Sequence, residues 1–127
     1  MKSRNIQIIG TSFILIAICL GAFGAHALKS ILIPSQLNSF EVGVRYQIYQ
    51  GLALLILSII NNSTPINTWV IRLITIGTIL FSGSIYCLST FPAILDIQAK
   101  FLGPITPIGG TLLIVAWILF LIQKIKE

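Results

Sequence analysis

Residues 6–27 read IQIIGTSFILIAICLGAFGAHA and contain no Asp, Glu, Lys or Arg. A helix that crosses the hydrocarbon core of a bilayer needs about 20 apolar residues, so this run is long enough to span it. Three further apolar runs cover residues 44–60, 69–88 and 104–122. Because lipid offers no hydrogen-bond partner to backbone groups, each run must satisfy them internally, and we expect four transmembrane helices.

The composition supports a membrane protein. Of the 127 residues, 56% are hydrophobic and 9% are charged, whereas about 25% of the residues of soluble proteins are charged. A soluble fold of this size cannot keep so much apolar surface from water. We therefore predict an all-α, multi-pass bundle in one domain, 1–127, with the bilayer as its surroundings. The net charge of +5 is spread over separate loops, so nucleic acid is not an expected partner.

The basic residues predict the orientation of the bundle. One side of the predicted topology has five of them, Lys2, Arg4, Arg72, Lys124 and Lys126, and the other has Lys29, Arg45 and Lys100. Cytoplasmic loops carry the excess of Lys and Arg, so both termini are expected in the cytoplasm. Trp69 and Tyr86 are expected at the membrane interfaces, and Trp117 is expected to pack against another helix.

Two segments near the first helix leave alternatives open. Residues 30–43 mix polar and apolar side chains, which predicts a short amphipathic helix on the outer surface between helices one and two. The N-terminus also has the features of a signal peptide, with Lys2 and Arg4 before the apolar run and Ala25-His26-Ala27 as a small-x-small cleavage pattern. The apolar run is longer than a usual signal-peptide core, which favours a retained helix.

Small residues on the first helix predict close helix packing. Ala17, Gly21 and Ala25 are spaced four apart, with Gly24 beside them. Such a stripe lets two backbones approach closely in lipid. Packing within the monomer is the favoured interpretation, and an oligomer contact or a solute path is the alternative.

Polar residues near the ends of the first two helices predict a cavity or an interhelical network. The candidates are His26, Tyr46, Gln47, Tyr49 and Gln50. Buried amides in lipid form hydrogen bonds across helices. For the single histidine, a structural hydrogen bond is favoured over a proton relay or a ligand role.

The segment at the start of the fourth run, Gly103 to Gly110, contains two prolines and three glycines. Prolines are tolerated in the first turn of a helix, which predicts a helix start. The same composition suits a broken helix that exposes carbonyl groups to a solute. The candidate residues are Gly103, Pro104, Thr106, Pro107, Gly109 and Gly110.

No motif for a metal, nucleotide or covalent catalysis is present. Cys19 and Cys87 have no metal-ligand spacing, and the three acidic residues are Glu41, Asp96 and Glu127. Glu41 lies one turn before Arg45 and predicts a weak surface ion pair. No metal or cofactor and no enzymatic activity is therefore expected.

Several of these segments together resemble the domain-of-unknown-function family 423 (DUF423), which is similar to the eukaryotic transmembrane protein 256 family. The matching pieces are Gly21-Ala22-Phe23-Gly24-Ala25-His26, Tyr46-Gln47-Ile48-Tyr49 with Leu52-Ala53-Leu54-Leu55, Leu80 to Tyr86, and Gly103 to Gly110. The resemblance implies a small integral membrane protein that retains its first helix. In the family pattern a histidine follows the second tyrosine, and here that position is Gln50, which argues against a two-histidine haem or metal site.

Three functions follow as hypotheses. The first is a non-enzymatic accessory, assembly or interaction protein, in a homo-oligomer or a membrane-protein complex, located in the plasma membrane if the source is bacterial. The second is an oligomeric transporter or channel for a small solute or ion. The third, least favoured, is a redox or quinone-linked membrane enzyme that uses His26.

Overall fold

The computed structural model describes residues 1–127 and is entirely helical. Its elements in chain order are α1 (Ser3–Ala25), the 3₁₀ turn η1 (Leu28–Ser30), α2 (Pro34–Ser63), α3 (Thr68–Ile94), the 3₁₀ turn η2 (Lys100–Leu102) and α4 (Ile105–Lys126). The prediction of an all-α bundle with four membrane-spanning helices is confirmed. Four of the helices, α1 to α4, are long and apolar enough to cross a membrane.

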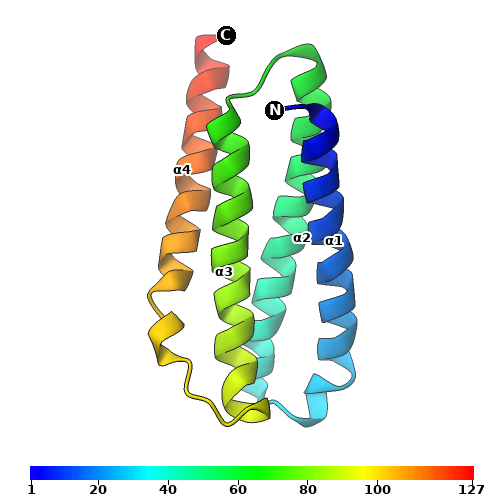
Figure 1. The fold of residues 1–127 in the computed structure, drawn as a ribbon, viewed down its shortest axis with the longest axis vertical. Helices are drawn as coiled ribbons and strands as arrows, with labels where there is room; N and C mark the ends of the chain where they lie inside the picture. The colour runs from blue at the N-terminus through cyan, green and yellow to red at the C-terminus, as the bar shows by residue number, and fades with distance from the viewer.

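The helices pack in chain order. α1 lies against α2, α2 against α3 and α3 against α4, with α1 and α4 at the two edges (Figure 1). Both termini lie at one end of the bundle, and the α1–α2 and α3–α4 connections lie at the other (Figure 1). The molecule therefore has a terminal end and a loop end.

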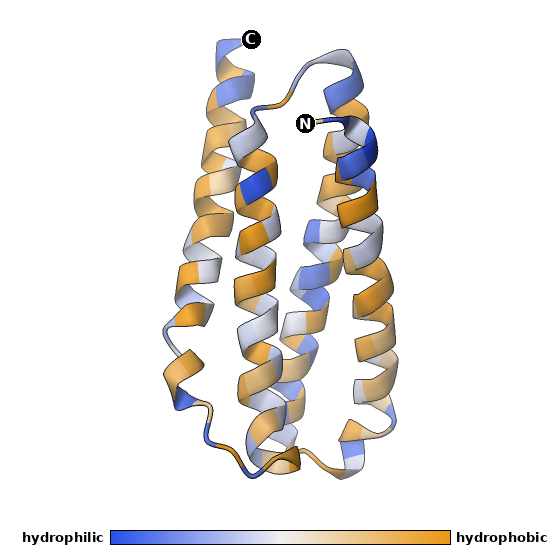
Figure 2. Cartoon of the chain, viewed as in Figure 1, coloured by the Kyte–Doolittle hydropathy of each residue, from blue (hydrophilic) through white to orange (hydrophobic).

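The outer surface is apolar over most of its length (Figure 2). Side chains such as Ile59, Ile79 and Ile114 are more than half exposed, at 65%, 56% and 62%. Large contiguous apolar surface is rare on soluble monomers. In a bilayer these same side chains contact lipid tails, so the surface fits the membrane prediction.

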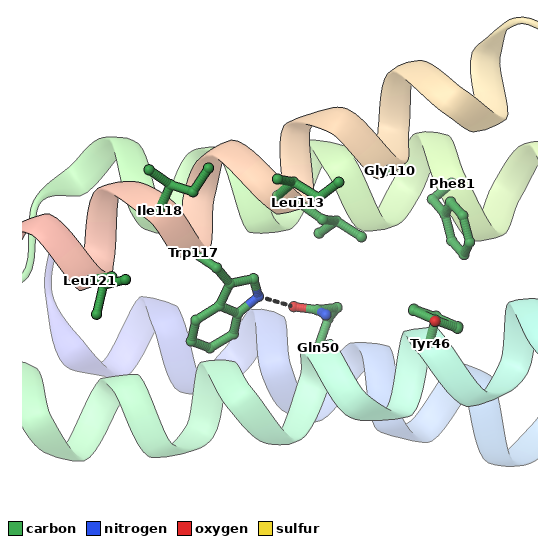
Figure 3. Close-up of a pocket in the computed structure, with 9 residues that line it drawn as sticks. Tyr46, Gln50, Phe81, Gly110, Leu113, Trp117, Ile118 and Leu121 are labelled. Atoms are coloured by element: carbon green, nitrogen blue, oxygen red, sulfur yellow. Dashed lines mark hydrogen bonds between the residues drawn. The ribbon is translucent and has the colours of Figure 1, made fainter.

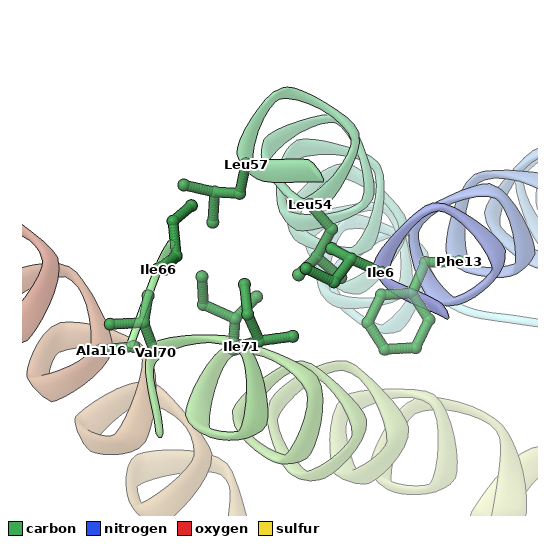
Figure 4. Packing of buried hydrophobic residues seen from close by; sticks show 9 residues of the cluster. Ile6, Phe13, Leu54, Leu57, Ile66, Val70, Ile71 and Ala116 are labelled. Atoms are coloured by element: carbon green, nitrogen blue, oxygen red, sulfur yellow. The ribbon is translucent and has the colours of Figure 1, made fainter. Parts of the chain in front are cut away.

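The main core lies toward the terminal end and draws on all four helices (Figure 4). Its centre consists of fully buried branched side chains, Ile6 from α1, Leu54 from α2, and Val70, Ile71 and Ile74 from α3. A second, smaller cluster between α1 and the first half of α2 lies toward the loop end. The buried apolar interior therefore consists of two clusters, one toward each end of the bundle.

The start of α2 corrects the prediction of a separate amphipathic helix at 30–43. α2 runs without interruption from Pro34, and only the η1 turn lies between it and α1. Pro34 occupies the first turn, where its missing N–H needs no partner, and the Gln36 side chain accepts a hydrogen bond from the Ile33 N–H at 3.2 Å. The segment is amphipathic because it is the end of a long helix that approaches the membrane surface.

Helix α3 also extends beyond its predicted end. The Asn67 side chain caps its start by accepting a hydrogen bond from the Trp69 N–H at 3.0 Å. The helix then continues through Pro92 to Ile94, although the predicted span ends at residue 88. Proline removes one backbone hydrogen bond but does not end this helix.

Two glycine crossings bring helix backbones into direct contact. A Cβ atom on Gly10 would lie 2.8 Å from the Gly51 carbonyl oxygen, and one on Gly77 would lie 3.0 Å from the Gly109 carbonyl oxygen. Real Cβ atoms essentially never come as close as the first of these distances. Glycine at these sites therefore lets α1 approach α2 and α3 approach α4, as expected for helix packing in membranes.

Side-chain amides form hydrogen bonds between the segments at the terminal end. The Asn61 side chain donates to the Met1 carbonyl at 3.1 Å and to the Ser3 hydroxyl at 2.9 Å. The Gln123 side chain donates to the Pro65 carbonyl at 2.8 Å and accepts from the Asn67 N–H at 3.0 Å. These bonds join the end of α2 to the start of α1, and the α2–α3 connection to the end of α4.

The glycine crossing on α4 yields a test with an adjacent control. Gly109→Ala would push a methyl group into the Phe81 backbone, and we expect it to lower the free energy of unfolding by about 1–3 kcal/mol through overpacking. Gly110→Ala places its Cβ 3.6 Å from the Phe81 ring, an ordinary contact. Unfolding in mixed micelles, followed by circular dichroism, measures both variants. Equal stability of the two variants would contradict the crossing.

Candidate functional site

A hydrogen-bonded network links α1, α2 and α3 inside the bundle. The buried Gln47 side chain donates to the Phe13 carbonyl at 2.8 Å and accepts from the Tyr86 hydroxyl at 2.6 Å. A cavity of about 180 Å³ lies beside this network. Tyr86, which was predicted as an interfacial anchor, turns its hydroxyl inward, where it bonds to an amide that needs a partner in lipid.

Hydroxyl groups make two further contacts between helices. The Ser82 hydroxyl donates to the Gly43 carbonyl at 2.8 Å, which joins α3 to α2. The hydroxyls of Ser84 and Thr106 share a hydrogen bond between α3 and α4. Thr106, a candidate from the Gly103–Gly110 segment, thus fixes the start of α4 against α3.

A groove lies between α2 and α4, and Phe81 of α3 also lines it (Figure 3). Its volume is about 580 Å³. The lining residues are Tyr46, Gln50, Phe81, Gly110, Leu113, Ile114, Trp117, Ile118 and Leu121. One hydrogen bond crosses the groove from α4 to α2, from the Trp117 indole N–H to the Gln50 carbonyl oxygen at 3.3 Å (Figure 3).

The five polar candidates separate into three places. Tyr46 and Gln50 line the groove, whereas Gln47 faces the opposite side of α2 in the buried network. Tyr49 is 54% exposed beside Tyr46, with ring centroids 5.8 Å apart. His26 is exposed just after α1. It lies 13 residues beyond Phe13, about 20 Å along the chain at helical rise, and forms no side-chain hydrogen bond within the chain.

The Gly103–Gly110 segment begins a regular helix. Gly103 ends the η2 turn, Pro104 precedes the first residue of α4, and the helix then continues to Lys126. Pro107 falls in the first turn, where its missing N–H is tolerated. Gly109 forms the crossing with α3, and Gly110 lines the groove.

The small residues of α1 face α2 only in part. A Cβ on Gly21 would contact Val44 at 3.3 Å, and one on Gly24 would contact the Phe40 ring at 3.0 Å. Ala25 is exposed at the end of the helix. The tightest contact of this pair, at Gly10 and Gly51, was not predicted, because its two members lie 41 residues apart in sequence.

A polar strip on the outer face of α1 was also missed. Arg4, Gln7, Thr11 and Ser12 are all exposed and line a shallow hollow of about 290 Å³. None of their side chains forms a hydrogen bond or an ion pair within the chain. The signal in the sequence was the spacing of Arg4, Gln7 and Thr11 at three and four residues on one helix face.

Potential metal ligands do not gather in the structure. No three His, Cys, Asp or Glu residues lie close enough together to hold a metal ion. Cys19 is exposed and Cys87 is half-buried, and both are free thiols. Glu41 and Arg45 form the expected exposed pair, with 4.0 Å between carboxylate and guanidinium.

Comparison with known proteins identifies the family. Residues 20–110 match a family described as "Protein of unknown function (DUF423)". The chain belongs to this family. The resemblance inferred from the sequence motifs is thereby confirmed, and three of the segments that carry it meet at the groove through Tyr46, Phe81 and Gly110.

DUF423 relatives extend along almost the whole chain. A UPF0382 membrane protein of Staphylococcus aureus (strain bovine RF122 / ET3-1) is 43% identical over 94% of this chain and 93% of its own length. UPF0382 membrane proteins of Staphylococcus saprophyticus and Staphylococcus haemolyticus are 41% and 38% identical, each over 94% of this chain and over 95% and 93% of their own lengths. No solved structure matches the chain. The names and lengths of these relatives agree with the four apolar helices of this chain, which is a small membrane protein.

The buried network yields a second test. Tyr86→Phe would leave the Gln47 carbonyl oxygen without its 2.6 Å donor, and we expect a loss of about 1 kcal/mol in the free energy of unfolding. Tyr49→Phe is the control, because the Tyr49 hydroxyl is on an exposed ring and forms no hydrogen bond within the chain. Unfolding titrations in mixed micelles compare the two. Equal losses would show that the Tyr86–Gln47 bond is not stabilising.

Proposed function

We propose that the protein is a non-enzymatic interaction protein of the plasma membrane, which associates with another transmembrane helix through the outer face of α1. The observation that carries this proposal is the polar strip of Arg4, Gln7, Thr11 and Ser12 on that face. Among the long helices α1 packs mainly against α2, and its outer face, which carries the strip, is open to a neighbour.

Part of the polar strip lies well below the membrane surface. Thr11 and Ser12 lie eight and nine residues after Ser3, the first residue of α1, which corresponds to about 12–14 Å along the helix. Hydroxyl groups at that depth have no water to bond. A helix that presents Ser, Thr, Asn or Gln side chains would supply their partners, as polar residues do between helices in membranes. Arg4, nearer the helix end, can extend to the headgroups.

The interior supports an interaction role in a different way. Apart from the Ser89 hydroxyl, its buried amide and hydroxyl groups bond to one another or to the backbone, as in the Gln47–Tyr86 and Ser84–Thr106 contacts. Their arrangement is that of groups that join helices. The neighbouring helix belongs to a second copy of the chain or to another membrane protein, and the experiment below distinguishes the two.

The proposed orientation places the terminal end in the cytoplasm. Lys2, Arg4, Arg72, Lys124 and Lys126 favour that end under the positive-inside rule. Trp69 supports the assignment of a membrane interface there, because it is 58% exposed in the first turn of α3 and the Arg72 guanidinium lies 5.3 Å from its ring centroid. The staphylococcal relatives support a bacterial plasma membrane.

Cross-linking in native membranes tests the association. In a background with Cys19→Ser and Cys87→Ser, Thr11→Cys is expected to give a cross-linked product with a thiol-reactive reagent, because the partner helix covers this position. The mass of the product shows whether the partner is a second copy or another protein. Ile59→Cys on the lipid-facing side of α2, 65% exposed, is the matched control. Equal products at both positions, or none at Thr11, would reject the proposal.

Labelling of single cysteines tests the orientation. In the same background, Lys29→Cys at the loop end is expected to react with a membrane-impermeant maleimide in intact cells, because this end faces outward. Lys126→Cys is expected to react only after the membrane is permeabilised. The reverse pattern would show that the bundle is inverted.

A further inference from the structure

We infer that the groove between α2 and α4 is a binding site for an uncharged, lipid-soluble molecule whose flat ring carries a carbonyl oxygen, a class that includes the quinones. This inference is independent of the association through α1, because the groove and the polar strip lie on different helices and share no residue. It concerns binding alone.

The polar residues of the groove lie deep in the membrane. Gln50 lies 16 residues after the start of α2 and 13 before its end, and Trp117 lies 12 residues after the start of α4 and nine before its end. At helical rise, about 13–24 Å of helix extends on either side of these residues. They therefore lie near the middle of a hydrocarbon core about 30 Å thick.

The groove holds hydrogen-bond donors that have no partner at that depth. The Gln50 carbonyl oxygen accepts the Trp117 indole N–H at 3.3 Å. The two amide N–H groups of Gln50 and the hydroxyl of Tyr46 form no hydrogen bond within the chain, although both side chains line the groove (Figure 3). Polar groups in hydrocarbon are costly unless they are paired. These donors are suited to an acceptor oxygen on a molecule inside the groove.

The walls of the groove are apolar, aromatic and uncharged. The volume of about 580 Å³ is within the range of small-molecule sites, which combine apolar walls with a few polar groups. Tyr46, Phe81 and Trp117 supply aromatic rings, and the Tyr46 and Phe81 centroids are 5.0 Å apart. Rings favour offset or edge contacts with other rings. No charged residue lines the groove, which favours an uncharged ligand.

A molecule dissolved in the bilayer can reach the groove, because several of its residues are exposed on the outer surface. Tyr46 and Trp117 are 42% and 37% exposed, and Ile114 and Leu121 at the lip of the groove are 62% and 59% exposed. The groove therefore opens sideways into lipid. A phospholipid keeps its polar headgroup at the surface, so its acyl chain can fill the groove but cannot pair with Gln50. A ring carbonyl compound that dissolves in the bilayer reaches both.

The test uses fluorescence of purified protein in nanodiscs, with decylubiquinone as the probe. Trp69→Phe leaves Trp117 as the single tryptophan. We expect saturable quenching of Trp117 by decylubiquinone. Gln50→Leu is expected to weaken binding about tenfold, the factor for losing one good hydrogen bond. Decylbenzene, which has a ring and a tail but no oxygen, is expected to compete at least about tenfold more weakly, for the same reason.

A pair of glycine variants controls for folding. Gly110→Leu adds a side chain inside the groove, where its Cβ meets Phe81 at an ordinary 3.6 Å, and we expect saturable quenching to disappear. Gly83→Leu adds the same side chain on α3, where nothing lies within 4 Å, and is expected to bind the probe as the parent protein does. Circular dichroism and gel filtration verify that both variants fold.

Three results would overturn the inference. One is quenching of the parent protein that rises linearly without saturation. Another is unchanged binding in a folded Gly110→Leu variant. The third is competition by decylbenzene as strong as that of the quinone, which would show that the groove accepts any apolar chain.

Discussion

Close backbone contact at Gly10 with Gly51 and at Gly77 with Gly109 determines how this bundle is built. In lipid, no hydrophobic force presses helices together, so contact depends on dispersion between surfaces that fit and on hydrogen bonds. The two crossings make α1 with α2, and α3 with α4, the closest pairs. The pairs are joined along α2 and α3 by side-chain hydrogen bonds, and the groove arises where α2 and α4 stay apart.

Local features of the chain predicted much of the fold. Hydropathy and length located the four spans, and the prolines near residue 105 located the start of α4. The separate amphipathic helix at 30–43 was wrong because a helix end at a membrane surface has the same polarity pattern as a helix lying on that surface. The partners of Gln47 are 34 and 39 residues away, and no local pattern in a single sequence reveals such pairings.

Polar side chains in this protein divide into those that bond inside the chain and those that do not. Gln47 and Ser82 join helices, and their surroundings explain them fully. Gln50 and Gln7 have the same amide chemistry but face a groove and the lipid, respectively. Sequence analysis selected Gln47 and Gln50 together, since both lie on α2, but only the three-dimensional arrangement separates a structural amide from a candidate for binding.

The amide bonds at the terminal end make the two ends of the bundle mechanically unequal. Asn61 and Gln123 fasten the short α2–α3 connection to the neighbouring helices, whereas the α3–α4 connection at the other end spans residues 95–104. Beside Leu121 the groove is bounded by helices that the α2–α3 connection ties together, whereas beside Tyr46 its width depends on the Ser82–Gly43 and Ser84–Thr106 hydrogen bonds between the helices themselves.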